Sequence, residues 1–327
     1  MRRLLLRLSP ALHLTRITTA FAAVANVWFV ILWTSASEPE PKPASFQQFP
    51  LWVLLLGGAV NAVGLFTYTT ALNDVLDFRR DQTLHPNRPI PSGRMSLDRA
   101  VTVVVLTLAT AVLGAIILGP VAVLLTLIVA GAALFFNAAG KYVPAIGLVV
   151  LGLMYAGQMV TPNLHLLFVL PVWLVMTHAL AVAGIAHVFG RKAPGISARA
   201  FAFAFSGWAF WSSVMFVVGW WRNFGQGGLW PRFVNPWAWA PPVILAALFA
   251  VLVWRRVAVL GRGPRVAEKI HRYGALWLSF YACSWMFSQH YQNQAIILGV
   301  LTLVGFLGMT VLREVYALIE HPIAYRT

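Results

Sequence analysis

Acidic side chains are scarce in this chain, and so are cysteine and charge in general. Only nine of its 327 residues are Asp or Glu, charged residues of both signs make up 10%, and Cys283 is the single cysteine. One cysteine excludes an internal disulfide and a thiolate metal cluster. Because 60% of the residues are hydrophobic, too little charged surface is available to keep the chain in water. We therefore predict an integral membrane protein.

Most of the sequence consists of long apolar runs. A helix needs about twenty apolar residues to cross the hydrocarbon of a bilayer. Ten segments approach or exceed that length: 14–34, 50–72, 99–118, 120–138, 143–160, 164–188, 199–221, 238–258, 273–290 and 293–312. They do not alternate with a period of two and are too long for barrel strands, so helices are the expected way to satisfy their backbone in lipid. The fold class predicted is all-α, a polytopic transmembrane bundle that forms one domain over residues 1–327.

The basic residues alternate between loops. If all ten segments cross the membrane, every one of the 24 lysines and arginines except Lys42, Arg222 and Arg232 falls on the same side. Basic loops face the cytoplasm, which predicts cytoplasmic termini and a cytoplasmic position for the candidate site below. The net charge of +15 is then interpreted as a topology signal that also attracts anionic membrane lipids, and no nucleic-acid partner is predicted.

Three of the four aspartates lie within eight positions, directly after the apolar run 50–72. If the helix that contains this run continues through Asp81, then Asn73, Asp77 and Asp81 recur four residues apart and share one face, while Asp74 lies beside them. Mg²⁺ prefers oxygen ligands and commonly takes one or two carboxylates together with substrate phosphates. The pattern predicts half of a site for a metal-bound phosphate.

A solvated helix end is the simpler alternative for these aspartates. In that case Asp81 would pair with Arg79 or Arg80, and no metal would be involved. The loop that follows runs from His85 to Arg94 and contains Arg88, whose neighbour Pro89 stiffens the backbone. The simplest role for Arg88 is that of a positive-inside topology signal.

The order Asn73-Asp74-x-x-Asp77-x-x-x-Asp81, followed by Asn-Arg-Pro-Ile-Pro-Ser-Gly-Arg over residues 87–94, resembles the first signature of the UbiA superfamily of intramembrane prenyltransferases. The resemblance implies a bundle of nine helices, here with a possible tenth, around a central cavity that opens to lipid. It also implies that Mg²⁺ helps to ionise an isoprenoid diphosphate and that a lipophilic acceptor traps the resulting carbocation. The acceptor would be a prenylglycerol phosphate or an aromatic quinone precursor.

Carried onto this chain, the resemblance assigns roles to single residues. Asn73, Asp77 and Asp81 would bind Mg²⁺ and its diphosphate, with Asp74 as a weaker metal ligand. Arg88 would hold diphosphate oxygens. Lys141, at the end of another helix, would reach the same phosphate and would act with Asp77 and Asp81 as the catalytic set. The family usually has a tyrosine where this chain has Asn137, so the group that positions or deprotonates the acceptor is left open.

The second signature of the family is altered here. Where relatives carry acidic residues for another metal, residues 183–195 contain no acid, and His187 and Arg191 stand at the expected places of two aspartates, followed by Lys192. We therefore expect no second Mg²⁺, and His187, Arg191 and Lys192 are predicted to contact diphosphate directly, since fixed cations are good phosphate partners.

Two other functions remain open at this point. A non-catalytic descendant could use the same cations to bind isoprenoid phosphate lipids or to translocate them across the bilayer. A carrier for small anions would also use a cationic pocket, but it leaves the aspartate cluster unexplained.

Overall fold

The computed structural model describes Leu14 and residues 20–320, with the side chains of residue 309 and of residues 312–320 left out. Within this part the chain is helical and contains no strand. The helices are α2 (Phe21–Ala36), α3 (Ser45–Gln48), α4 (Leu51–Leu76), α5 (Phe78–Leu84), α6 (Leu97–Leu118), α7 (Pro120–Ala138), the 3₁₀ turn η2 (Gly140–Tyr142), α8 (Pro144–Met159), α9 (Leu170–Phe189), α10 (Ala198–Arg222), α11 (Ala240–Leu260), α12 (Pro264–Ser288) and α13 (Gln292–Glu320). The predicted all-α class is confirmed.

Each of the ten apolar segments coincides with one long helix, although part of segment 14–34 lies outside the described residues. Six of the described helices are long and apolar enough to cross a membrane, namely α4, α6, α7, α9, α10 and α11. Helices α2 and α8 and residues 292–308 of α13 form shorter apolar helices. The number of crossings, nine or ten, stays a prediction, as does the central cavity.

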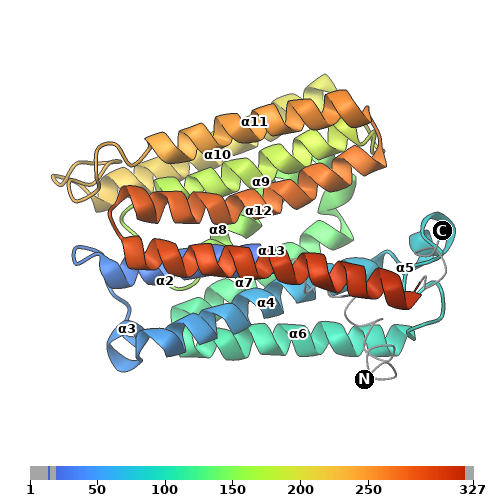
Figure 1. Ribbon diagram of the computed structural model, residues 1–327, viewed down its shortest axis with the longest axis horizontal. Helices are drawn as coiled ribbons and strands as arrows, with labels where there is room; N and C mark the ends of the chain where they lie inside the picture. The colour runs from blue at the N-terminus through green and yellow to red at the C-terminus, as the bar shows by residue number, and fades with distance from the viewer. Residues whose placement is uncertain (1–13, 15–19, 321–327) are drawn as a thin grey trace.

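Helix ends follow local sequence signals. Proline occupies the first turn of α7, α8, α9, α11 and α12, where its missing N–H removes no helical hydrogen bond. Ser96 and Ser197 cap α6 and α10 by accepting backbone N–H groups. Gly119, at φ 114°, turns the chain between α6 and α7. The long helices therefore stop at defined points and run roughly side by side along the molecule (Figure 1).

Helix α2 lies at the centre of the bundle. It is buried along nearly its whole length, and α4, α8, α12 and α13 all pack against it. The aromatic side chains Trp33, Phe168 and Trp285 meet near one end of this core, with ring centroids 5.3 Å apart for the first pair and 5.2 Å for the second. The outer helices α10 and α11 are much less buried than α2. In each of them, only 11% of the apolar stretch is buried in the protein.

The closest helix pairing joins α4 to α6. A Cβ atom added to Gly114 would lie 2.3 Å from the backbone nitrogen of Asn61, and one added to Gly64 would lie 2.5 Å from that of Ala111. Only glycine permits this approach. Asn61 then spans the contact, donating to the carbonyl of Ala111 at 2.9 Å and to Thr126 Oγ1 at 2.8 Å. This close packing fixes the position of α4 against α6, and therefore the position of the aspartates at the end of α4.

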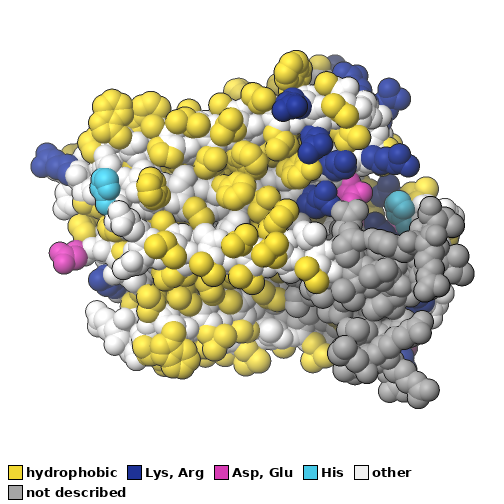
Figure 2. Space-filling model, in the orientation of Figure 1, with side chains coloured by type: hydrophobic (Ala, Val, Ile, Leu, Met, Phe, Trp, Pro, Cys, Tyr) yellow, Lys and Arg dark blue, Asp and Glu magenta, His cyan; other side chains and the backbone are white. Residues whose placement is uncertain are grey.

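Charge collects at one end of the molecule. The space-filling view shows most of the visible Lys and Arg side chains at the end where α4, α9 and α11 finish and α12 begins (Figures 1 and 2). The connections after α2 and α10 lie at the opposite end (Figure 1). The basic loops are thus brought together as the alternating pattern predicts, while the side of the membrane that they face stays a prediction. Both chain termini lie outside the described residues.

Candidate diphosphate and metal site

The helix that carries the aspartates is interrupted at Asp77. Helix α4 ends at Leu76, α5 begins at Phe78, and Asp77 between them has φ −83° and ψ 0°. The expected uninterrupted helix through Asp81 is therefore wrong at this residue. The hydrogen-bond register nevertheless continues, because Asp77 N–H donates to the carbonyl of Asn73 at 2.9 Å and Asp81 N–H to that of Asp77 at 2.8 Å. The side chains keep an almost helical spacing across the break.

The four proposed metal ligands divide into two pairs, each joined by a cation of the chain itself. Lys141 Nζ lies 3.0 Å from Asn73 Oδ1 and 2.8 Å from Asp77 Oδ2. Arg88 Nη1 lies 3.2 Å from Asp74 Oδ1 and 2.5 Å from Asp81 Oδ2. Residues four apart and residues seven apart each share a helix face. The predicted single stripe of Asn73, Asp77 and Asp81 is therefore replaced by two neighbouring ones, with Asp81 beside Asp74.

Burial makes these ion pairs necessary. Asp74, Asp77 and Asp81 are only 5%, 8% and 3% exposed, and a buried carboxylate is costly unless a cation or hydrogen-bond donor satisfies it. The amide of Asn73 also donates to Asp74 Oδ1 at 3.2 Å, which links the two pairs into one network. The alternative of a solvated helix end is not what the geometry shows, because Asp81 is buried and its partner is Arg88.

Tyr142 joins the network, and the sequence analysis missed it. Its hydroxyl donates to Asp77 Oδ1 at 3.0 Å, and its ring lies under the Lys141 ammonium, 5.4 Å from the centroid. Partial burial and the neighbouring Asp77 raise the pKa of Tyr142, with Arg80 opposing the shift. Its position directly after Lys141 was the available signal. We call Asn73, Asp74, Asp77, Asp81, Arg88, Lys141 and Tyr142 the acidic network.

The donor set of the acidic network fits Mg²⁺ in kind. It offers one amide and three carboxylate side chains, and such oxygen ligands suit a hard cation. Within Leu14 and residues 20–320, however, no group of three or more His, Cys, Asp or Glu side chains is arranged to hold a metal ion. A site built here would thus use one or two carboxylates at a time, the number usual for Mg²⁺ that shares its coordination with phosphate.

His187, in the last turn of α9, and Arg191 and Lys192, directly after that helix, are a separate set of residues, which we call the basic loop. His187 Nε2 lies 2.7 Å from the carbonyl of Pro194, Lys192 Nζ lies 3.5 Å from His271 Nε2, and Arg191 adopts a left-handed backbone with φ 52°. Lys192 is exposed, yet partial desolvation lowers the pKa of its ammonium. No hydrogen bond or ion pair among the described residues joins His187, Arg191 or Lys192 to the acidic network. Sequence reasoning missed His271, which lies in another helix, α12.

Comparison with known proteins identifies the relationship. The model of the UbiA prenyltransferase family matches residues 27–264. A structure of a digeranylgeranylglyceryl phosphate synthase aligns with a TM-score of 0.54 and 17% identity over 86% of this chain and 98% of that one. The apo structure of a UbiA homologue from Aeropyrum pernix K1 aligns with a TM-score of 0.52 and 18% identity over 81% and 96%.

A UbiA homologue from Archaeoglobus fulgidus, bound to DMAPP and Mg²⁺, aligns with a TM-score of 0.45 and 11% identity over 92% of this chain and 99% of that one. Comparison with curated protein sequences gives no significant match. The extent of the domain, residues 1–327, stays a prediction. The family match covers well over half of the chain, and the apolar helices satisfy the requirement of a bilayer. The chain therefore belongs to the UbiA prenyltransferase family and is an integral, multi-pass membrane protein.

Proposed function

We propose that this protein transfers a prenyl group from an isoprenoid diphosphate to a lipophilic acceptor, with Mg²⁺, at the cytoplasmic end of the bundle. One observation carries the proposal: two pairs of oxygen ligands, with all three carboxylates buried, lie at the end of α4 and in α5, and each pair holds a cation, one from the loop after α5 and one from the turn before α8. Such an arrangement would suit a prenyltransferase, and this chain belongs to a family of prenyltransferases.

The paired cations can change partners when substrate binds. A diphosphate carries more negative charge than a single carboxylate, so it attracts Arg88 and Lys141 away from Asp81 and Asp77. Those carboxylates, with Asn73 and Asp74 beside them, are then free to ligate metal. Mg²⁺, when bound, would supply positive charge to the leaving diphosphate. Arg88 and Lys141 stabilise the same developing charge from the protein side.

Asp77 has a second partner that persists through this exchange. The Tyr142 hydroxyl donates to its other carboxylate oxygen, Oδ1, while Lys141 pairs with Oδ2. If the Lys141 ammonium moves from Asp77 to the substrate, the Tyr142 hydroxyl therefore still orients Asp77. The Oδ2 atom of Asp77 is then available to a metal. We propose Asp77, Asp81 and Lys141 as the catalytic residues, and the Tyr142 hydroxyl as the group that orients Asp77.

The basic loop is proposed to contact the diphosphate from the other side of the bundle. The described part of the chain places no carboxylate within ion-pair distance of His187, Arg191 or Lys192, so their charge is available to an anionic substrate. This would compensate for the acidic residues that the second family signature lacks. The acceptor proposed is a prenylglycerol phosphate or an aromatic quinone precursor.

A non-catalytic function is the second candidate. Every carboxylate of the acidic network is already paired with a cation of the chain, and among the residues that the structure describes no hydrogen bond or ion pair joins the basic loop to that network. A protein that only binds isoprenoid phosphate lipids, or translocates them, would use the cations in the same way without ionising the diphosphate.

Diphosphate release separates the two candidates. Purified protein would be incubated with labelled geranylgeranyl or farnesyl diphosphate, a panel of acceptors, and either Mg²⁺ or EDTA. We expect release that requires Mg²⁺ and falls about 100-fold or more in Asp77→Asn, since that change removes a group that acts on the developing charge. Asp98→Asn, at the exposed fourth aspartate, is the matched control and should release diphosphate normally. Tight donor binding without release under every condition would favour the non-catalytic function.

A further inference from the structure

A surface groove lies on the outer face of the bundle, far in sequence from the acidic network. It has a volume of about 450 Å³, within the size range of small-molecule sites, roughly 300–1,000 Å³. Leu248, Val251, Leu252 and Val259 of α11 form its apolar wall, with Trp277 of α12 beside them. Leu248 and Val259 are 52% and 77% exposed, which shows that this wall faces outward from the bundle.

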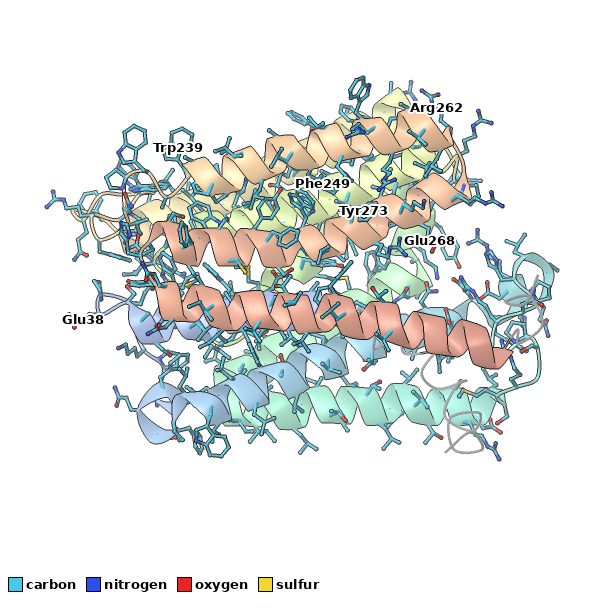
Figure 3. The ribbon with its side chains drawn as sticks, viewed as in Figure 1. Glu38, Trp239, Phe249, Arg262, Glu268 and Tyr273 are labelled. Carbon is cyan, nitrogen blue, oxygen red and sulfur yellow. The ribbon has the colours of Figure 1, made fainter. Side chains whose placement is uncertain are left out.

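The groove has a cationic end. Arg255 and Arg256 line it toward the end of α11 at which the basic loops collect. The guanidinium of Arg256 lies 5.2 Å from the centre of the Tyr273 ring, and that of Arg272 lies 5.7 Å from the same centre. Figure 3 shows Tyr273 where α12 faces α11, and Figure 2 shows the cluster of basic side chains over this region.

Among the described residues these arginines have no acidic partner. No carboxylate of that part of the chain lies in ion-pair distance of Arg255, Arg256 or Arg272, although Glu268 is on the same helix as Arg272. The Tyr273 ring attracts the guanidinium groups of Arg256 and Arg272 but neutralises neither charge. A bound anion would supply the opposite charge, whereas in the acidic network the chain supplies it.

We propose that this groove binds an anionic glycerophospholipid of the surrounding bilayer, with an acyl chain along α11 and the phosphate between Arg256 and Arg272. Only 11% of the apolar window of α11 is buried, so the groove opens to hydrocarbon, and its arginines lie near the end of the span, where headgroups are found. A basic end and an apolar body match the two parts of such a lipid.

A second copy of the chain fits this face poorly. In a symmetric membrane dimer the same patch meets itself, and an axis along the membrane normal keeps both sets of arginines at the same depth. The contact would thus bring like charges together. The isoprenoid donor is also disfavoured, because α11 packs against α12 while the acidic network lies on α4, α5 and the adjoining turns.

Lipid retention tests the proposal. Full-length protein would be extracted from vesicles of phosphatidylglycerol and phosphatidylcholine, and its bound lipids counted by native mass spectrometry. We expect preferential retention of phosphatidylglycerol, reduced about tenfold in the double variant Arg256→Gln/Arg272→Gln, as removal of two arginines near an anionic headgroup implies. The double variant Arg262→Gln/Arg265→Gln removes equal charge from the turn beside the groove and should retain the lipid.

A second variant tests the apolar half of the site. Leu252→Trp keeps both arginines and fills the groove, so it should also lower phosphatidylglycerol retention, with thermal unfolding used to verify the fold of each variant. Equal loss in the groove and control double variants would overturn the proposal, since it would indicate attraction by net charge alone. So would equal retention of both lipids, displacement by geranylgeranyl diphosphate, or a dimer that depends on Leu252.

Discussion

The acidic network and the basic loop lie at the same end of the bundle but satisfy their charges in opposite ways. In the acidic network, Asp74, Asp77 and Asp81 are buried, and Arg88 and Lys141 supply the opposite charge from inside the chain. In the basic loop, Lys192 is exposed and its nearest polar partner is His271, which is not an acid. The first region takes its counter-charges from within the chain, whereas in the second the described residues leave the Lys192 ammonium without a carboxylate partner.

Under the proposed function, this difference would let one bundle hold a diphosphate with only one acidic signature. The network would exchange its own cations for a metal, because oxygen ligands suit both. The basic loop has no carboxylate to offer a metal and can only contribute cations. The two regions therefore make separable predictions, one about metal and one about anion affinity.

The largest effect is expected where the network loses an internal cation. Arg88→Gln removes the cation that pairs with the buried Asp81 and also contacts Asp74, and it should lower the free energy of unfolding by about 3 kcal/mol. That is the low end for a buried pair, because the Arg88 side chain is 29% exposed. Mg²⁺ should restore part of this loss by taking the place of the guanidinium, so that it raises the midpoint of thermal unfolding more in the variant than in the original protein.

The exposed Arg99→Gln, near the start of α6, is the control for that experiment. It should unfold like the original protein and show no special response to Mg²⁺. If Arg88→Gln proved equally stable, or if Mg²⁺ did not stabilise it, the idea that the network exchanges internal cations for a metal would be wrong.

An intermediate effect is expected in the basic loop. The double variant Arg191→Gln/Lys192→Gln should weaken binding of a non-hydrolysable prenyl diphosphate about 10- to 100-fold, the loss expected for charge-assisted hydrogen bonds. It should not change the stability gained from Mg²⁺, since no hydrogen bond or ion pair of the described residues joins this loop to the acidic network. Isothermal titration calorimetry measures the affinity, and Arg199→Gln, at the exposed start of α10, is the control. Unchanged affinity in the double variant would remove the basic loop from the site.

The smallest effect is a dependence on pH that differs between the regions. Desolvation lowers the pKa of Lys192 from its usual value, so its ammonium is lost at a lower pH than that of an ordinary lysine. The affinity that it contributes is complete well below this lowered pKa and disappears as the pH rises through it. Diphosphate affinity should therefore fall with rising pH before an ordinary lysine would lose its proton, and Lys192→Arg should remove the fall because arginine stays charged.

Tyr142 provides the counterpart in the acidic network. Partial burial and Asp77 raise the pKa of its phenol, so the hydroxyl keeps its proton to a higher pH than an ordinary tyrosine does. Tyr142→Phe should leave the slope of affinity against pH unchanged. A slope that vanished in Tyr142→Phe and survived in Lys192→Arg would reverse the assignment.

Much of the architecture was predictable from residue order. The ten apolar segments correspond to helices within a few residues at most ends, because hydrophobic runs, first-turn prolines and serine caps act locally. The gathering of basic loops at one end also follows from counting residues between spans. The spacing of Asn73, Asp77 and Asp81 indicated a ligand face, but it did not show the break at Asp77 or the grouping of Asp81 with Asp74.

The membrane class, the helices and the acidic stretch follow from residue order alone, since they depend on neighbouring residues and on the need to satisfy the backbone in lipid. The partners of the acidic residues, in contrast, become visible only in the folded chain. Lys141 reaches Asn73 across 68 positions and Tyr142 reaches Asp77 across 65, and the lipid-facing groove exists because α11 packs beside α12. Such contacts depend on how helices distant in sequence are placed against one another, and no local pattern of residues encodes that placement.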